Sequence, residues 1–507
     1  MRIAVASSVL LTLARISHGH LLASPTLYRP VGIWMLLGAH PPSQALVSVL
    51  WVVAWASSFA MLVGLATRLA TIASFVSGVS LASLVFAANS TWSHQYNIVF
   101  LAQLALFGAR SGDALSVDAL FRRPAVPNAY QWSLRLVQLA VAVMFVSAVF
   151  HKLLFGHFTL RWAFSDNLRN QLLVRFDLAH LPRPALASWL IDHPWRYRTA
   201  ALLNMISQAM PLLAIVHVRR PWVRALAGLF FVIETISLGL VVDLWNLHWL
   251  PLAAVFIDWE HLLARPVDRG APVRPRRAAR TFIAAFVAYD IVTALVPTLD
   301  QRLNTYPFSG FPMFAKVRAR PPYDDHQPYS LPGESFEVTA ERPIDQPLQS
   351  WFDHAHRDLE TVRDPDVLHR ELTAILAEAR RAYPAYGVRS LRVWLTIFEA
   401  PAYPAPAHLE RHPIAILGEL ADDGSFRTQL GTLHGRPGTP GATLELHAPA
   451  GSRLVYYRDD VPTPHDLGPT TSSSADLSRV LDGHSIDLVV FVDGAPWLVA
   501  SYSRWAW

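Results

Sequence analysis

Cysteine is absent from this chain of 507 residues. That absence excludes disulfide bonds, catalysis by a thiolate and zinc sites built from cysteine. Charged residues are also scarce, at 16% of the sequence, against about 25% in an ordinary soluble domain. The sequence contains no P-loop, no HExxH pair, no GxSxG elbow and no dinucleotide-binding fingerprint. The common nucleotide-binding, metalloprotease and serine-hydrolase sites are therefore not indicated.

Hydrophobic residues make up 52% of the chain, and their excess lies almost entirely before residue 299. Apolar runs recur there that are long enough to cross the ~30 Å hydrocarbon layer of a bilayer as helices. After residue 300 the acidic residues, histidine and proline return, and no run is long enough to span. We therefore expect an all-α polytopic membrane bundle over 1–298, followed by a soluble α+β domain over 299–507.

The apolar runs predict eight or nine membrane-spanning helices. The first run is ambiguous, because Arg2 followed by a short apolar stretch is also typical of a signal peptide. The predicted spans are 1–16, 44–66, 69–88, 95–109, 131–153, 199–217, 222–242, 244–263 and 280–298.

Arginine placement orients this predicted bundle. One set of loops carries arginines such as Arg68, Arg110 and Arg220, whereas the opposite loops 89–95 and 243–248 contain no Lys or Arg. The positive-inside rule assigns the arginine-bearing set to the cytoplasm, so the C-terminal domain is expected outside it. The exception is 154–198, an outside loop with arginines, where "LRNQLLVRF" resembles an amphipathic surface helix. Arginines confined to short loops indicate topology rather than nucleic-acid binding.

The C-terminal part has the patterns of a mixed fold. Helical spacing occurs in "PLQSWFDHAHRDLETVRD" and "DVLHRELTAILAEARRAY". Strand patterns occur in "LRVWLTIFEA", "ATLELHA", "SRLVYYR" and "IDLVVFVDGAPWLVASY", the last a hairpin turning at Asp493-Gly494. In "HLERH" at 408–412 two histidines stand four residues apart, but no third ligand is evident, so no metal site is predicted.

Lys152 is the residue that most needs explanation, because it lies at the outer end of the fifth predicted span. His94 lies in an outer loop at the same predicted depth. Gln138, Val141, Phe145 and Ala148 share the helix face of Lys152, and a face with a glutamine is expected inside the bundle. The alternative is a lysine that reaches the lipid headgroups, with His94 simply solvated. A desolvated amine could instead serve as a general base.

The stretch "TWSHQYNIVFLAQLALFGARSGDALSVDALFRR" followed by "WSLRLVQLAVAVMFVSAVFHKL" resembles the membrane core of vitamin K-dependent gamma-carboxylases. Bacterial relatives of that core form the horizontally transferred transmembrane (HTTM) family. The shared pattern is a Trp-x-x-His-x-Tyr loop, an apolar helix, a Ser-Gly-Asp-x-x-Ser-x-Asp turn and a helix ending in Lys-Leu. The resemblance also includes "YPFSGFPMF" at 306–314 and fades beyond it.

The resemblance implies a catalytic lysine at Lys152, the base that deprotonates reduced vitamin K or another quinol. Oxygenation would give a strong base that removes a proton from a glutamyl side chain, and carbon dioxide would then add. His94 would assist the carboxylation, and Trp92 and Tyr96 of the same loop are candidate cofactor-binding residues. These two aromatic residues could instead belong to an interfacial belt.

The leading hypothesis is therefore a multi-pass protein of a bacterial inner membrane that oxygenates a quinol. It could also carboxylate a glutamate-containing protein or peptide. The competing hypothesis is a non-catalytic membrane protein that anchors its C-terminal domain and presents it to a partner. A transporter is less well supported, because the spans show no repeat symmetry.

Overall fold

The computed structural model describes most of the chain and divides it into two compact units. The described residues are 1–16, 28, 30–36, 38, 40–89, 95–109, 111–121, 131–178, 180–217, 220–262, 277–295, 314, 316–319, 326–345, 348–349, 351–352, 364–446, 448–458, 461–470, 474–480 and 484–502. The helical unit comprises Met1–Leu172 and Arg183–Arg318, and the C-terminal unit comprises Leu173–Pro182 and Ala319–Trp507. The predicted boundary at residue 298 falls outside the described residues.

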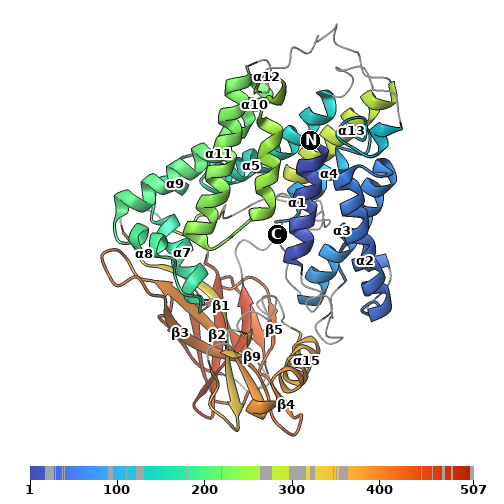
Figure 1. The fold of residues 1–507 in the computed structure, drawn as a ribbon. Coiled ribbons are helices and arrows are strands. Elements are labelled where there is room, and N and C mark those ends of the chain that lie inside the picture. The colour runs from blue at the N-terminus through green and yellow to red at the C-terminus, as the bar shows by residue number, and fades with distance from the viewer. Residues whose placement is uncertain are drawn as a thin grey trace. The chain divides into compact units, whose positions relative to one another are not determined.

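Five helices among the described residues are long and apolar enough to cross a membrane. The chain is therefore treated as a membrane protein, and five of the predicted spans coincide with these helices. They are α2 (Gln44–Val63), α3 (Thr67–Asn89), α5 (Gln131–Phe155), α9 (Pro194–Ala209) continued by η5 (Met210–Leu212) and α10 (Leu213–Val216), and α11 (Pro221–Val242) (Figure 1).

The other four predicted spans fall on shorter or less apolar elements, which are not among the five. They are α1 (Arg2–Arg15), α4 (Asn97–Leu104), η6 (Leu247–Phe256) and α13 (Arg277–Leu295). The segment η6 is a 3-10 helix rather than an α-helix, and it contains Pro251, which cannot donate a helical hydrogen bond. The count of eight or nine spans remains a prediction.

Short helices connect the long ones in the helical unit. They are η2 (Gly32–Leu36), η3 (Asp118–Leu120), α6 (Arg161–Phe164), α8 (Ala185–Ile191) and α12 (Trp259–Leu262). Helix α7 (Asn167–Leu178) crosses the division between the units after Leu172. The expectation of a surface helix at 168–176 is wrong, since Arg169, Asn170 and Leu172 in α7 are almost fully buried. Its amides bond to a later segment: Asn170 Nδ2 donates to the Arg318 carbonyl at 2.7 Å. Such tertiary partners cannot be read from a helical pattern.

Sequence explains where α2 begins and ends and which environment it suits. The Ser43 hydroxyl accepts a hydrogen bond from the Leu46 backbone N–H, and Gly64 ends the helix with a φ of 76°. Along its length α2 exposes apolar side chains, among them Val49 and Val52, more than half of whose surface is uncovered. A helix with an apolar exposed face suits contact with lipid rather than water.

The C-terminal unit is built on an eight-stranded sheet with the order β1-β2-β3-β11-β10-β7-β8, in which β4 pairs with β3. A second sheet has the order β5-β6-β9. The strands are β1 (Tyr329–Ala340), β2 (Val388–Ala400), β3 (Glu410–Leu420), β4 (Phe426–Arg427), β5 (Thr432–His434), β6 (Thr443–Glu445), β7 (Arg453–Arg458), β8 (His465–Pro469), β9 (Ser474–Asp476), β10 (Ile486–Val492) and β11 (Ala495–Tyr502).

Each face of the large sheet has its own apolar core. Helix α15 (Pro365–Ala382) buries Leu368, Leu372 and Ile375 in the core of one face. Leu444 of the small sheet belongs to the other core, with Leu488 of β10. The unit is therefore a layered α+β fold, as the helix and strand patterns of its sequence predicted. A 3-10 turn, η10 (Pro384–Tyr386), follows α15.

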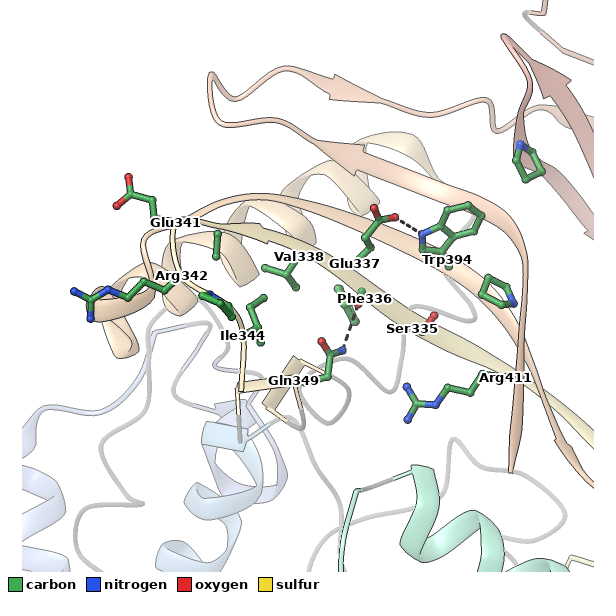
Figure 2. Close-up of a pocket in the computed structure, with 14 residues that line it drawn as sticks. Ser335, Phe336, Glu337, Val338, Glu341, Arg342, Ile344, Gln349, Trp394 and Arg411 are labelled. Carbon is green, nitrogen blue, oxygen red and sulfur yellow. Dashed lines mark hydrogen bonds between the residues drawn. The ribbon is translucent and has the colours of Figure 1, made fainter. Parts of the chain in front are cut away.

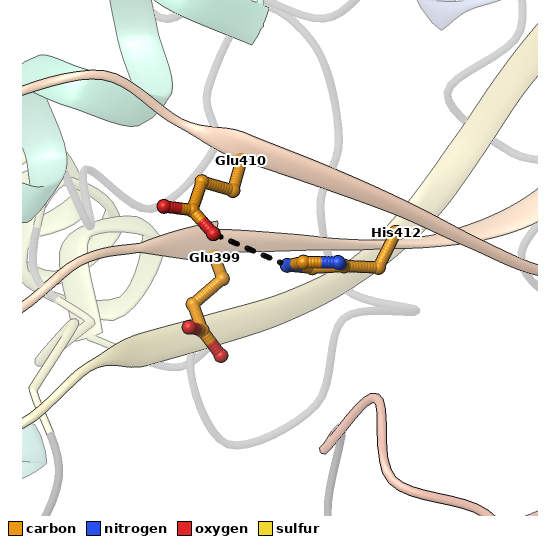
Figure 3. A group of neighbouring side chains, drawn as sticks. All are labelled: Glu399, Glu410 and His412. Carbon is orange, nitrogen blue, oxygen red and sulfur yellow. Dashed lines mark ion pairs between the residues drawn. The ribbon is translucent and has the colours of Figure 1, made fainter.

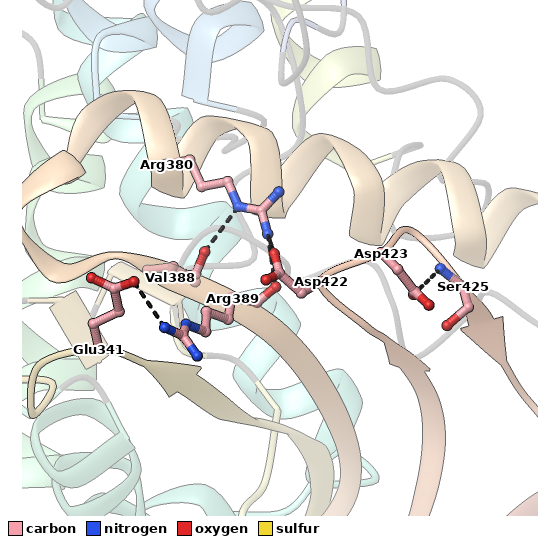
Figure 4. A network of polar contacts seen from close by, with 7 residues as sticks. All are labelled: Glu341, Arg380, Val388, Arg389, Asp422, Asp423 and Ser425. Carbon is pink, nitrogen blue, oxygen red and sulfur yellow. Dashed lines mark hydrogen bonds and ion pairs between the residues drawn. The ribbon is translucent and has the colours of Figure 1, made fainter.

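Polar contacts fasten α15 to the strand ends, as Figure 4 shows. Arg380 donates to the Val388 carbonyl at 2.8 Å and to the Asp422 carboxylate at 2.6 Å. Arg389 pairs with Glu341 at 3.0 Å. Because these side chains are substantially exposed, each pair contributes little stability and mainly fixes geometry.

The predicted hairpin at the end of the chain is confirmed. Strands β10 and β11 pair antiparallel from Ile486↔Tyr502 to Val492↔Ala495. Asp493 and Gly494 both have positive φ, 53° and 79°, which the two-residue hairpin turn requires. The predicted strands 391–400, 442–448 and 452–458 and the helix 366–383 are also present. The other predicted helix, 347–364, lies largely outside the described residues, and β1 and β3 were not predicted.

Candidate functional site

Lys152 lies on the last turn of α5 and points into the helical unit. Its side chain retains 1% of its exposure, and Gln138, Val141, Phe145 and Ala148 on the same face are fully buried. The prediction that this face turns inward is therefore confirmed, and the lysine is not a headgroup anchor. Its burial places an amine in surroundings that exclude water.

Two side-chain amides hold the Lys152 amine. Nζ donates to Asn204 Oδ1 at 2.5 Å and to Gln208 Oε1 at 2.7 Å. It also lies 4.1 Å from the ring centroid of Trp162 in α6, within range of a cation–π interaction. Asn204 and Gln208 are four residues apart on α9, so one helix face presents both oxygens.

The same two amides connect Lys152 to a buried carboxylate. Glu234 of α11 is 2% exposed, and its Oε1 accepts from Asn204 Nδ2 at 2.6 Å and from Gln208 Nε2 at 2.8 Å. We call Lys152, Asn204, Gln208 and Glu234 the Lys–Glu network. An amine and a carboxyl group buried together carry no net charge whether both are ionised or both are neutral, and such pairing is how ionisable groups are retained inside apolar protein.

Of these partners, Glu234 has a signal in the sequence. It is the single acidic residue inside α11, and an ionisable residue within a membrane span is by default a candidate for function. Asn204 and Gln208 have helical spacing within a predicted span, but no pattern assigns them to Lys152.

The predicted loop residues are only partly described. Trp92 and His94 lie outside the described residues, so the expected approach of His94 to Lys152 remains a prediction. Tyr96 is 3% exposed, and its ring lies 5.9 Å from that of Phe86 and 5.5 Å from that of His248. Tyr96 is thus packed inside the helical unit rather than placed in an exposed interfacial belt.

The backbone just after His94 is fixed against η6. The carbonyl of Gln95 accepts a hydrogen bond from Trp249 Nε1 at 2.7 Å and lies 2.9 Å from His248 Nε2. Trp249 in turn packs against Phe145 of α5, with ring centroids 5.9 Å apart. Phe145 shares the buried face of Lys152, so this loop is tied to the helix that carries the amine.

The Ser-Gly-Asp turn has a structural role. The Asp118 carboxylate accepts from the backbone N–H of Ala66 at 2.9 Å and of Thr67 at 2.8 Å, which caps the start of α3. A side chain at Gly112 would meet Thr67 Oγ1 at 2.5 Å, so this glycine is required by close approach. The turn therefore fixes the start of α3.

The motif at 306–314 is described only at its end. The carbonyl of Phe314 accepts from Trp162 Nε1 at 2.8 Å and from Gln171 Nε2 at 2.9 Å. Because the Trp162 ring faces the Lys152 amine, the end of this motif orients one wall of the site.

The C-terminal unit contains a hollow of 1110 Å³ along β1, shown in Figure 2. Trp394 Nε1 donates to Glu337 there at 2.8 Å, and Gln349 Nε2 donates to the Phe336 carbonyl at 3.3 Å. The lining mixes apolar and charged groups and is open on one side. It presents no group of reactive atoms comparable with the Lys–Glu network.

The helices and this network define a class of protein: a helical membrane protein with a buried network that joins an amine to a carboxyl group. Comparison with protein-family models, with curated proteins and with solved structures gives no match. The function therefore has to be argued from the chemistry of the site.

Proposed function

We propose that the protein is a membrane-embedded enzyme of the vitamin K-dependent gamma-carboxylase type, in which Lys152 is the base toward a reduced quinone. The observation that carries the proposal is the burial of the Lys152 amine among apolar helices, with polar partners that suit its protonated form. A base used on a weak acid needs surroundings from which water is excluded.

The residues around Lys152 fit a quinol. The indole face of Trp162 and the apolar helix walls suit a flat, lipidic ring, and the amine suits its hydroxyl group. When bound, a reduced quinone supplies an acidic hydroxyl and the electrons for oxygenation. The form of Lys152 that acts as the base is the free amine, which accepts the proton at Nζ. The oxygens of Asn204 and Gln208 then stabilise the ammonium so formed, and the Glu234 carboxylate balances its charge.

The loop residues His94, Trp92 and Tyr96 belong to the same proposal. The tie between Gln95, Trp249 and Phe145 supports a position of this loop beside the helix of Lys152. In the proposal His94 assists carboxylation of a glutamyl side chain, while Trp92 and Tyr96 contact the quinol.

An epoxide assay tests the enzymatic role. Purified protein in detergent, given reduced vitamin K, oxygen and bicarbonate, should form the epoxide, and Lys152→Ala should not. Lys152→Arg is the sharper variant, because a guanidinium keeps the positive charge but does not act as a base. It should be folded and inactive. Lys316 is the only other lysine and is exposed, so Lys316→Ala is the matched control and should retain full activity.

Carboxylation is tested separately, by incorporation of labelled bicarbonate into a glutamate-containing peptide. Epoxide without incorporation would limit the activity to quinol oxygenation. Epoxide formation by Lys152→Arg at the rate of the unaltered protein would disprove the role of the lysine.

A non-catalytic membrane protein that presents its C-terminal unit is the second candidate. The observation that favours it is that the four side chains of the Lys–Glu network satisfy one another, as a purely structural network would. Absence of epoxide from the unaltered protein, with any quinol supplied, supports this candidate.

The proposal includes a bacterial inner-membrane location, eight or nine spans and an extracytoplasmic C-terminal unit. The absence of cysteine makes orientation directly testable with single cysteine substitutions. Asp493→Cys, in the exposed hairpin turn of the C-terminal unit, should react with a membrane-impermeant maleimide added to intact cells. Leu120→Cys, 79% exposed in a loop assigned to the cytoplasm, should react only after lysis. The reverse pattern would invert the topology.

A further inference from the structure

Three potential metal ligands meet on neighbouring strands of the C-terminal unit. Glu399 of β2 pairs directly with Glu410 of β3, and His412 lies two residues further along β3 on the same face. Figure 3 shows Glu410 and His412 facing each other across an ion pair, with Glu399 on the neighbouring strand. One ligand atom from each lies within 4.8 Å of the others. Two of the three ligands, Glu410 and His412, lie in the "HLERH" segment, and the sheet adds Glu399. His408, the other histidine of that segment, is not part of the group.

Among the described residues, these three side chains have few partners. Two carboxylates directly opposite each other on a sheet repel, although the Glu410 side chain is 59% exposed and that of His412 is 34% exposed. The Ser330 hydroxyl donates a hydrogen bond to Glu399 at 3.2 Å, and His412 Nε2 lies 3.7 Å from the Glu410 carboxylate. The Nε2 atom is covered from solvent and has no hydrogen-bond partner among the described residues, which is costly for a polar atom.

A bound cation would offset the repulsion between the two carboxylates and would give His412 Nε2 a partner. We propose that Glu399, Glu410 and His412 form a binding site for a divalent transition-metal cation of the zinc type. The imidazole favours such a cation over calcium or magnesium, which prefer oxygen ligands alone. Three protein ligands leave one position of a tetrahedral site for water or for a ligand of the cation. Ser330 would hold Glu399 in orientation from outside the site.

The required movement is small and local. Bonds of about 2.1 Å in a tetrahedral site place ligand atoms roughly 3.4 Å apart, somewhat closer than the 4.8 Å limit within which they now lie. Rotation about the flexible glutamate side chains closes that gap. The paired strands β2 and β3 need not move.

Zinc titration of the full-length protein in detergent, after removal of metal with a chelator, tests the site. Isothermal titration should detect one zinc ion per chain. Glu410→Gln and His412→Ala should each weaken zinc binding by more than a hundredfold, because losing a partner outside the ligand set already costs about tenfold to a hundredfold. Replacing zinc by cobalt should give the visible absorption of a tetrahedral cobalt site, and His412→Ala should abolish it.

The small sheet provides a matched control. His434 Nε2 lies 3.2 Å from Glu445, so it offers a histidine and one carboxylate, and that pair is not part of the three-residue group. His434→Ala should leave zinc affinity unchanged. In metal-free protein, Glu410→Gln should unfold at the same temperature as the unaltered chain or higher, because it relieves repulsion. Absence of zinc binding, or equal weakening by His434→Ala and His412→Ala, would overturn the proposal.

Discussion

The Lys–Glu network can be tested as a coupled unit by removing its charges one at a time and together. Lys152→Met removes the ammonium with little change of volume and leaves the Glu234 carboxylate buried. Glu234→Gln keeps an oxygen for the two amide donors and removes only the negative charge. Breaking a buried ion pair at one partner costs about 3–5 kcal/mol, so the two single changes sum to about 6–10 kcal/mol.

The double variant should lose far less than that sum. It contains no uncompensated charge, and its main cost is the loss of the lysine donor by the oxygens of Asn204 and Gln208. An unsatisfied buried acceptor costs about 1–3 kcal/mol, which gives about 2–6 kcal/mol for both. The expected coupling energy between Lys152 and Glu234 is therefore about 4 kcal/mol.

Thermal unfolding in detergent, followed by tryptophan fluorescence, measures these differences. Each single variant should lower the Tm by roughly 6–10 °C, since 1 kcal/mol shifts the Tm of a large domain by about 2 °C. Lys316→Met, which removes the exposed lysine, should change it by less than about 1 °C. If the double variant loses as much stability as the two single variants combined, the two charges are not coupled and the network reasoning is refuted.

Three further predictions concern packing and acid stability. A Cβ at Gly228 would lie 2.7 Å from the Cβ of Phe256, so Gly228→Ala should lower the Tm of the helical unit by several degrees. An unchanged Tm would mean that η6 can shift to accommodate the added methyl group at no cost, and would contradict the prediction. Leu372 is fully buried in the C-terminal core, and Leu372→Ala should cost about 2–5 kcal/mol, measured by denaturant unfolding. The hydrogen bond from the Gly468 backbone N–H holds the pKa of Asp466 below its ordinary 3.8. The ionised carboxylate therefore stabilises the fold above about pH 4, and this contribution is lost as the pH falls further. Asp466→Asn should flatten that acid-induced fall in Tm, and an identical slope in both proteins would contradict it.

Local sequence determined much of the C-terminal unit. Short runs of β-branched, aromatic and other apolar residues predicted β2, β7, β10 and β11. Asp493-Gly494 specified the last turn because few residues adopt positive φ. Strand β3 was not predicted, since Pro413 interrupts its pattern and one of its two partners, β11, is distant in sequence. Pairing between distant strands compensates for such an interruption and leaves no local signal.

In the helical unit, the sequence by itself determined five long apolar helices and the face on which Lys152 lies. Hydrophobic length and helical periodicity are local properties, so they can be read directly. Only the tertiary structure decided that Asn204, Gln208 and Glu234 surround that amine, and that Glu399 joins Glu410 and His412. Those arrangements depend on which helices and strands become neighbours, and packing between distant segments decides that.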